Sequence, residues 1–369
     1  MNRSEENQVK EPLIRIVKRD TITLGKSITI RFLAIVLALL VDALIIYGVT
    51  KLNPLKVYGT MFSGAFGTGR RAWITVRDIM MLLCISVGLA PAFKMRFWNV
   101  GAEGQVLVGA IATAACMIYL NNLSTPVLIV IMFFASAIAG AIWGLIPALF
   151  KSRWDTNETL FTLMMNYIAI QLTSFMVANW ENPYGSNSVG VINPNTQAGW
   201  FPKMLGSNYW LNVILVMALT VFMFIYLRST KQGYEIAVVG ESRNTARYAG
   251  ISVRRVVIRT MLISGAVCGI AGMIGVAGVD HTISTATAGG RGFTAIIVAW
   301  MGKFNTFVMV LISALLVFLE RGAAEIASQY GLNEYASEMI EGVILFFLLG
   351  CEFFINYRVI IRHGEAQIK

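Results

Sequence analysis

Polar segments interrupt this apolar chain at a few places, and they hold most of the residue types that could act chemically. In the first, Asn99, Glu103 and Gln105 stand in Asn-Val-Gly-Ala-Glu-Gly-Gln, between two apolar runs. An ionisable group at membrane depth usually faces a cavity or a partner, and glycine lets backbones approach closely. These side chains therefore line a polar path or form an internal hydrogen-bonded hinge, and both interpretations stay open.

A second polar segment begins at Asn157. Glu158, Thr162 and Asn166 follow at intervals of four residues, so they form a polar stripe along one face of a helix. In a membrane helix such a stripe must face protein or water, because lipid cannot satisfy it. We interpret the stripe, with Asn157, as part of a path for a polar solute. Hydrogen bonds between helices are the alternative.

A third segment, Gly-Gly-Arg-Gly-Phe at 289–293, precedes a short apolar run and mirrors the first segment in the other half of the chain. Paired interrupted segments point to a site near the middle of the membrane, which makes Phe293 a candidate pathway residue. The four cysteines lie apart in apolar stretches, and the chain has two histidines. We therefore predict no catalytic residue, no metal site and no cofactor bound by this chain.

The composition indicates which elements must position these segments. The chain has 369 residues, 56% hydrophobic and 14% charged, whereas soluble domains carry about 25% charged residues. This excludes a soluble enzyme and a disordered chain. We predict an all-α polytopic membrane protein with about ten transmembrane helices. The predicted spans are 30–49, 78–93, 104–120, 126–149, 158–178, 210–227, 258–279, 288–301, 305–320 and 338–357. The spans 78–93 and 288–301 are short for a bilayer, which favours broken or re-entrant helices.

The distribution of charge predicts the orientation. The formal net charge is +10, and placing both termini in the cytoplasm puts 22 of the 30 Lys and Arg residues on that side. This asymmetry is typical of a membrane protein and argues against nucleic-acid binding. The predicted parts are a cytoplasmic tail at 1–29, a transmembrane domain at 30–357 and a second cytoplasmic tail at 358–369. Within the transmembrane domain we expect external loops at 50–77 and 179–209 and a cytoplasmic segment at 228–257.

The cytoplasmic segment 228–257 contains a predicted short helix, with Ser242 as its N-cap and Gly250 as its stop. Two turns of helix are unstable alone, so we expect this helix to dock on a soluble partner. A basic loop lying on anionic lipid is the alternative. The candidate docking residues are Glu241, Ser242, Arg243, Ala246, Arg247, Tyr248 and Gly250.

Two glycine pairs have the spacing that lets membrane helices approach each other closely. They are Gly140 with Gly144, and Gly265 with Gly269. The spacing predicts helix contact inside one bundle and says nothing about chemistry.

Four motifs, in order, resemble those of ABC importer permeases of the nucleoside and simple-sugar type. Residues 99–105 resemble the Asn-Ile-Gly-Ala-Glu-Gly-Gln signature, residues 157–169 the Asn-Glu…Thr-Leu-Met…Asn-Tyr-Ile-Ala element, residues 246–251 the cytoplasmic coupling segment, and residues 292–302 the late glycine-containing helix. The resemblance covers roughly residues 30–355, and the family is related to ribose and branched-chain amino acid permeases.

The resemblance implies a pore-forming transport subunit that is not itself an enzyme. Its expected partners are a second permease, homologous or identical, an extracytoplasmic solute-binding protein, membrane lipid, and a cytoplasmic ATPase that uses the ATP and docks at 242–251. Nucleosides are the expected solutes, with simple sugars next. An ion-coupled secondary transporter using Asp42, Glu103 or Glu158 is the alternative, but the short cytoplasmic helix favours the ABC importer.

Overall fold

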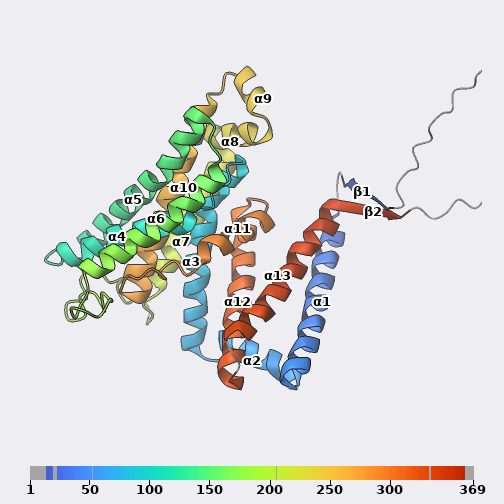
Figure 1. Cartoon of the computed structure of the whole chain (residues 1–369), viewed down its shortest axis with the longest axis horizontal. Helices are drawn as coiled ribbons and strands as arrows, with labels where there is room; N and C mark the ends of the chain where they lie inside the picture. Colours follow the sequence, from blue (N-terminus) through green and yellow to red (C-terminus); the bar gives the residue numbers. More distant parts are fainter. Residues whose placement is uncertain (1–13, 20–22, 52, 205, 332–333, 362–369) are drawn as a thin grey trace, which may run out of the picture. The chain divides into compact units, whose positions relative to one another are not determined.

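The structure is a computed structural model that describes residues 14–19, 23–51, 53–204, 206–331 and 334–361. The regular secondary structure of these residues is helical apart from one two-stranded sheet and an isolated β-bridge, which confirms the predicted all-α class (Figure 1). In chain order the elements are β1 (Ile14–Lys18), α1 (Leu24–Thr50), α2 (Pro54–Phe66), α3 (Gly69–Lys94), α4 (Ala102–Tyr119), α5 (Thr125–Trp154), α6 (Glu158–Asn179), α7 (Trp210–Ser229), α8 (Lys231–Glu241), α9 (Arg243–Tyr248), α10 (Val253–Gly275), the π-helical turn η1 (Val276–Asp280), α11 (Arg291–Met301), α12 (Thr306–Tyr330), α13 (Glu334–Asn356) and β2 (Tyr357–Ile361).

Seven helices in the described part of the chain are long and apolar enough to cross a membrane. They are α3, α4, α5, α6, α7, α10 with its extension η1, and α12. Shorter apolar helical stretches lie at Phe32–Gly48 in α1, in α11, and at Gly342–Asn356 in α13. Each of the ten predicted spans falls on one of these helices, so the polytopic membrane architecture is confirmed.

Two predictions about the early part of the chain are wrong. The span expected at 78–93 is part of a 26-residue helix, α3, which is long enough to cross the bilayer. It begins early because the Thr68 hydroxyl accepts a hydrogen bond from the backbone N–H of Arg71 at 3.2 Å. The region 50–77, expected as a loop, therefore holds α2 and the first turns of α3.

The late segment does form a short helix, as predicted. α11 has 11 residues and follows Gly289 and Gly290, whose φ angles are +61° and +73°. Such left-handed backbone is strained for any residue with a side chain. The glycines therefore permit the turn from which α11 starts.

The chain divides into two compact units, and the first comprises residues 1–64 and 322–369. In it α1 packs against α13, and β1 pairs antiparallel with β2 from Ile14 opposite Ile361 to Lys18 opposite Tyr357. The predicted tails 1–29 and 358–369 thus contribute a strand each, while their residues 1–13, 20–22 and 362–369 lie outside the described residues. That both termini are cytoplasmic stays a prediction.

The second unit, residues 65–321, is organised around α3 and α10. The most apolar windows of these helices are 89% and 78% buried, whereas that of α5 is 22% buried. α4 and α5 pack on α10, α6 packs on α4, and α7 and α11 pack on α3 (Figure 1). A helix that is apolar all round belongs inside a bundle, so α3 and α10 form its centre.

Glycines set the distance between α10 and its neighbours. A Cβ atom on Gly265 would collide with the carbonyl oxygen of Gly140, and one on Gly269 with that of Ser136. A Cβ on Gly144 would lie 2.8 Å from the carbonyl oxygen of Met261. The two predicted glycine pairs therefore pack against each other, which confirms the prediction of helix contact inside one bundle.

The two ends of this unit differ. At one end the carboxyl ends of α3, α5 and α7 lie near α8 and α9: Lys94 donates to the carbonyl oxygen of Leu227, and Arg243 pairs with Asp155. At the other end the irregular 181–204 segment folds over η1, where Trp200 stacks on His281 with centroids 3.8 Å apart. The predicted cytoplasmic segment and the predicted 179–209 loop are thus at opposite ends.

The close crossing of α10 with α5 generates a test. Gly269→Ala places a methyl group against backbone, so the helices must separate, and overpacking of this kind costs about 1–3 kcal/mol. We expect the thermal unfolding midpoint in detergent to fall by roughly 1–4 °C. Gly48→Ala is the matched control, because a Cβ there meets nothing within 4 Å. Equal midpoints for the two variants would contradict the close crossing.

Candidate functional site

Glu103 connects the two polar segments that the sequence placed in opposite halves of the chain. It lies in the first turn of α4 and is 7% exposed. Its carboxylate oxygens accept hydrogen bonds from the backbone N–H groups of Gly290 and Gly292, both at 2.8 Å. A carboxylate on the free N–H groups at a helix start makes charge-assisted bonds and complements the helix dipole. Glu103 therefore caps α11 from another helix.

The cap requires glycine on the receiving side. A Cβ atom on Gly292 would lie 2.6 Å from the backbone nitrogen of Glu103 and 2.7 Å from its carboxylate. α11 has 11 residues, so its start lies about 16 Å from the end that carries α8 and α9. The contact between Glu103 and α11 is therefore well inside the bundle.

Asn99 and Gln105 form a buried pair of amides beside this cap. The Asn99 amide nitrogen donates to Gln105 Oε1 and to Ser264 Oγ, each at 3.3 Å. In return Asn99 Oδ1 accepts from Gln105 Nε2 at 3.3 Å and from the Gly101 backbone at 3.1 Å. The pair joins the break between α3 and α4 to α10.

The polar stripe of α6 supports the same break. The Thr162 hydroxyl accepts from the backbone N–H of Val100 at 3.2 Å. The Asn166 side chain donates to the Val100 carbonyl and accepts from the Gly104 N–H, both at 2.9 Å. Backbone polar groups away from water need such partners. Of the two interpretations of this stripe, hydrogen bonding between helices is what these contacts describe, and a role in a solute path stays a prediction.

The other predicted pathway residues lie apart from this network. Asn157 is the N-cap of α6 and accepts from the N–H groups of Thr159 and Leu160. Glu158 pairs with Lys151 at 2.9 Å, near the end that carries α9. The Phe293 side chain is 46% exposed on α11. The structure thus brings together Asn99, Glu103, Gln105, Thr162 and Asn166.

A cluster of arginines around Asp78 was missed by the sequence analysis. Asp78 is 1% exposed, and Arg77 Nε and Arg321 Nε donate to its carboxylate at 3.0 and 2.6 Å. Arg291, the first residue of α11, approaches the same carboxylate at 3.4 Å. Charged residues at the edges of apolar runs are a signal for such a cluster, but 243 residues separate Asp78 from Arg321. α11 is therefore held at its start by Glu103 and by Asp78.

The predicted docking helix forms as α9, and its ends are as expected. The Ser242 hydroxyl accepts from the Thr245 N–H at 3.2 Å, and Gly250 has a φ of +75°. Ala246 is buried beneath the helix, whereas Arg247 is exposed and Tyr248 is 94% exposed. The N-cap and the stop are confirmed. Binding of a partner by these residues, and by Glu241 beside them, stays a prediction.

A basic groove of about 670 Å³ lies beside α9. Its charged lining residues are Lys151, Arg153, Asp155, Arg243, Arg247 and Arg254. Hydrogen bonds and charge from Lys151, followed by Arg243, hold the pKa of Asp155 below its usual range. The groove therefore keeps five cations against one carboxylate and complements an acidic surface.

Comparison with known proteins assigns the chain to one family. Residues 73–349 match the permease component of the branched-chain amino acid transport system, so the chain belongs to this family of ABC transporter permeases. It is thus a multi-pass protein of the plasma membrane. No solved structure matches the chain significantly.

Curated relatives cover most of the chain. A guanosine ABC transporter permease of Bacillus subtilis is 29% identical over 86% of this chain and 91% of its own. A glucose ABC transporter permease of Haloferax volcanii is 29% identical over 84% of each chain. A nucleoside ABC transporter permease of Lactococcus lactis is 26% identical over 88% and 91%.

The cap on α11 generates the second prediction. Glu103→Ala leaves the buried Gly292 N–H, and the less buried Gly290 N–H, without their acceptor. An unsatisfied buried N–H costs about 1–3 kcal/mol, so both the thermal midpoint and solute uptake should fall. Glu181→Ala is the matched control, because Glu181 also accepts from two backbone N–H groups but on an exposed loop. Normal uptake together with a normal midpoint in Glu103→Ala would contradict the cap.

The arginine cluster generates the third prediction. Asp78→Asn removes the charge that offsets three arginines, and breaking a buried ion pair costs roughly 3 kcal/mol. We expect a lower unfolding midpoint, partly restored when Arg321→Met is added. Asp155→Asn is the control, since Asp155 also meets two basic side chains but is exposed. An equal fall of the unfolding midpoint in Asp78→Asn and Asp155→Asn would show that burial of the cluster does not affect stability.

Proposed function

We propose that this chain is the pore-forming permease subunit of an ABC importer for a small polar solute, with nucleosides favoured and simple sugars next. Membership of the permease family carries the proposal. Two of the three relatives described above are named for guanosine or nucleosides and one for glucose, which supports this order of solutes. The chain itself holds no cofactor, and ATP is used by a partner subunit.

A cytoplasmic ATPase docks on α9 in this proposal. The exposed side chains of Arg247 and Tyr248 face away from the bundle, while Ala246 fixes the helix to it. The basic groove beside α9 attracts an acidic partner surface and sets its orientation. Closure of the ATPase then moves α9, and the permease exposes its path alternately to the two sides.

The solute arrives from an extracytoplasmic binding protein and passes between this permease and a second one, homologous or identical. The polar side chains near the break between α3 and α4 are engaged with one another, with Ser264 or with backbone, so they shape the path chiefly by fixing this break. They are Asn99, Gln105, Thr162 and Asn166. The exposed Phe293 on α11 offers an aromatic face on which a nucleobase can stack.

The ion-coupled alternative is not favoured. Among its three carboxylates, Glu103 caps α11 and Glu158 pairs with Lys151. Asp42 is buried in α1 with no hydrogen-bond partner among the described residues. Two of the three carboxylates that this alternative requires as ion-binding groups therefore already bind other groups of the protein.

The docking proposal predicts the behaviour of one surface variant. Arg247→Glu with Tyr248→Ala alters exposed side chains only, so the protein should insert and unfold as the wild type does. Co-purification of a nucleotide-binding ATPase in mild detergent should fall at least tenfold, and uptake of labelled guanosine should be lost. Adding unlabelled glucose to the wild type and measuring how far it reduces the uptake of labelled guanosine shows which of the two solute classes the permease prefers.

Arg255→Glu is the control, because it makes the same charge change on an exposed residue outside α9 and outside the groove. It should retain both the ATPase and uptake. Wild-type uptake by the α9 variant would overturn the docking role. Uptake that collapses with the ion gradient and needs no ATPase would overturn the importer itself.

A further inference from the structure

Four aromatic rings gather where the break between α3 and α4 meets the end of α11. The indole rings of Trp98 and Trp300 are stacked, with centroids 5.4 Å apart and an angle of 27° between their planes. Phe93 meets both indoles edge-on, at 5.8 and 6.2 Å, and Phe304 meets Trp300 edge-on at 5.5 Å. The cluster therefore joins α3, the break, α11 and the turn after α11.

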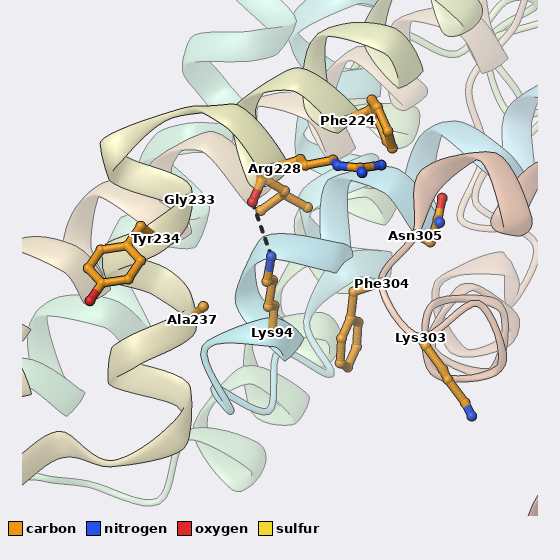
Figure 2. Close-up of a pocket in the computed structure, with 10 residues that line it drawn as sticks. Lys94, Phe224, Arg228, Gly233, Tyr234, Ala237, Lys303, Phe304 and Asn305 are labelled. Carbon is orange, nitrogen blue, oxygen red and sulfur yellow. Dashed lines mark hydrogen bonds between the residues drawn. The ribbon is translucent and has the colours of Figure 1, made fainter. Parts of the chain in front are cut away.

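The cluster lies at the end of the bundle that carries α8. Phe304 lines a pocket together with Lys94 of α3 and Tyr234 of α8 (Figure 2). Phe293, which is 46% exposed, stands seven residues before Trp300 on α11. Seven residues are two helical turns, so these two side chains share one face of α11 and lie about 10 Å apart. This face thus carries one exposed ring deep in the bundle and another near the end that carries α8.

The exposed face of α11 continues from a turn that cannot face lipid. In the turn 284–290, Ser284, Thr285 and the two glycines before α11 are exposed. This turn lies about 16 Å from the other end of α11, and the hydrocarbon core of a bilayer is about 30 Å thick. Irregular backbone occurs at that depth only where protein or water covers it. Protein or water, and not acyl chains, therefore adjoins the turn and the helix face that follows it.

The stacked pair of Trp98 and Trp300 is held firmly and keeps part of each ring accessible. Each of the two side chains is 44% exposed, whereas Phe93, which supports both, is 1% exposed. The Trp98 carbonyl accepts from the Thr162 hydroxyl at 3.3 Å. Neither indole N–H has a hydrogen-bond partner among the residues that the structure describes. Rings that are fixed in advance bind a planar ligand with little loss of conformational entropy.

A planar heteroaromatic ring with acceptor atoms at its edge fits this surface. Nucleobases stack on aromatic side chains, and the edge of guanine carries the acceptors N7 and O6. The indole N–H is a donor only, so each tryptophan offers a ring face and a group that matches such an acceptor. A sugar ring has hydroxyl groups but no planar face of this kind.

We infer that Trp98 and Trp300 form a stacking platform for the base of a nucleoside in the solute path, about 10 Å from Phe293 along α11. The inference rests on the proposed permease function and deepens it. The platform gives the permease a preference of its own for bases over sugars, in addition to any selection by a binding protein.

The test uses the full chain purified in mild detergent and 8-azidoguanosine, which carries a photoreactive azide on the base. After irradiation, mass spectrometry of the digested protein should find the label within residues 97–101 and 299–304. Excess guanosine should suppress this labelling, whereas ribose, which lacks the base, should not. Label found only elsewhere in the chain would overturn the inference, and this result does not depend on the folding of any variant.

Trp98→Leu with Trp300→Leu removes both ring faces and should reduce labelling at least fivefold, which corresponds to about 1 kcal/mol. Trp98→Phe with Trp300→Phe keeps a ring at each position and should retain labelling within about twofold. Phe222→Leu is the control, because this ring is 55% exposed and stacked on Tyr226 but lies on α7. It should label as the wild type does. Undiminished labelling in a leucine variant with the wild-type thermal midpoint would overturn the inference.

Uptake by cells that carry the complete importer tests the proposed function separately. Guanosine uptake by these cells, without label at the stacked pair, would overturn the platform and leave the importer in place. Guanosine uptake that collapses with the ion gradient, with label at the stacked pair, would overturn the ABC importer and support the platform.

Discussion

The arrangement of this protein depends on one constraint: a break in a helix inside a bilayer must be closed by groups of the protein itself. The carboxylate of Glu103 meets this requirement at the start of α11 by accepting from Gly290 and Gly292. Thr162 and Asn166 meet it at the break between α3 and α4. Because each break is closed by a different helix, the two interrupted segments are fixed to each other and to α6. The position of α11 thus follows from hydrogen-bond satisfaction as much as from apolar packing.

Glycine supplies the complementary requirement, which is close approach. α10 crosses α5 at a distance that admits no Cβ at Gly265 or Gly269, and it crosses α4 at a distance that admits none at Gly272. In lipid the hydrophobic effect does little to join helices, so such close packing must contribute the attraction. The same closeness places Ser264 of α10 within reach of Asn99. The glycine contact and the buried amide pair are therefore parts of one interface.

Local patterns in the sequence predicted the positions of the ten spans, the cap and stop of α9, and the contact between the glycine pairs, because each depends on residues a few positions apart. They did not predict the partner of Glu103, which lies 187 residues away, or the arginines around Asp78. Such pairs depend on which helices are neighbours, and periodicity does not contain that information. The length of α3 was wrong for a related reason, since its polar first turns resemble a loop until Thr68 is seen to cap them.

α8 connects α9 to the rest of the bundle through direct backbone contacts. A Cβ on Gly240 would collide with the Lys94 carbonyl oxygen of α3, and one on Gly233 with the Tyr226 carbonyl oxygen of α7. Backbone in direct contact with backbone transmits displacement with little slack, since packed interiors hardly compress. α9 follows α8 after the single residue Ser242. A displacement of α9 is therefore passed through α8 to the carboxyl ends of α3 and α7, and α3 extends from there to the ion cluster at Asp78.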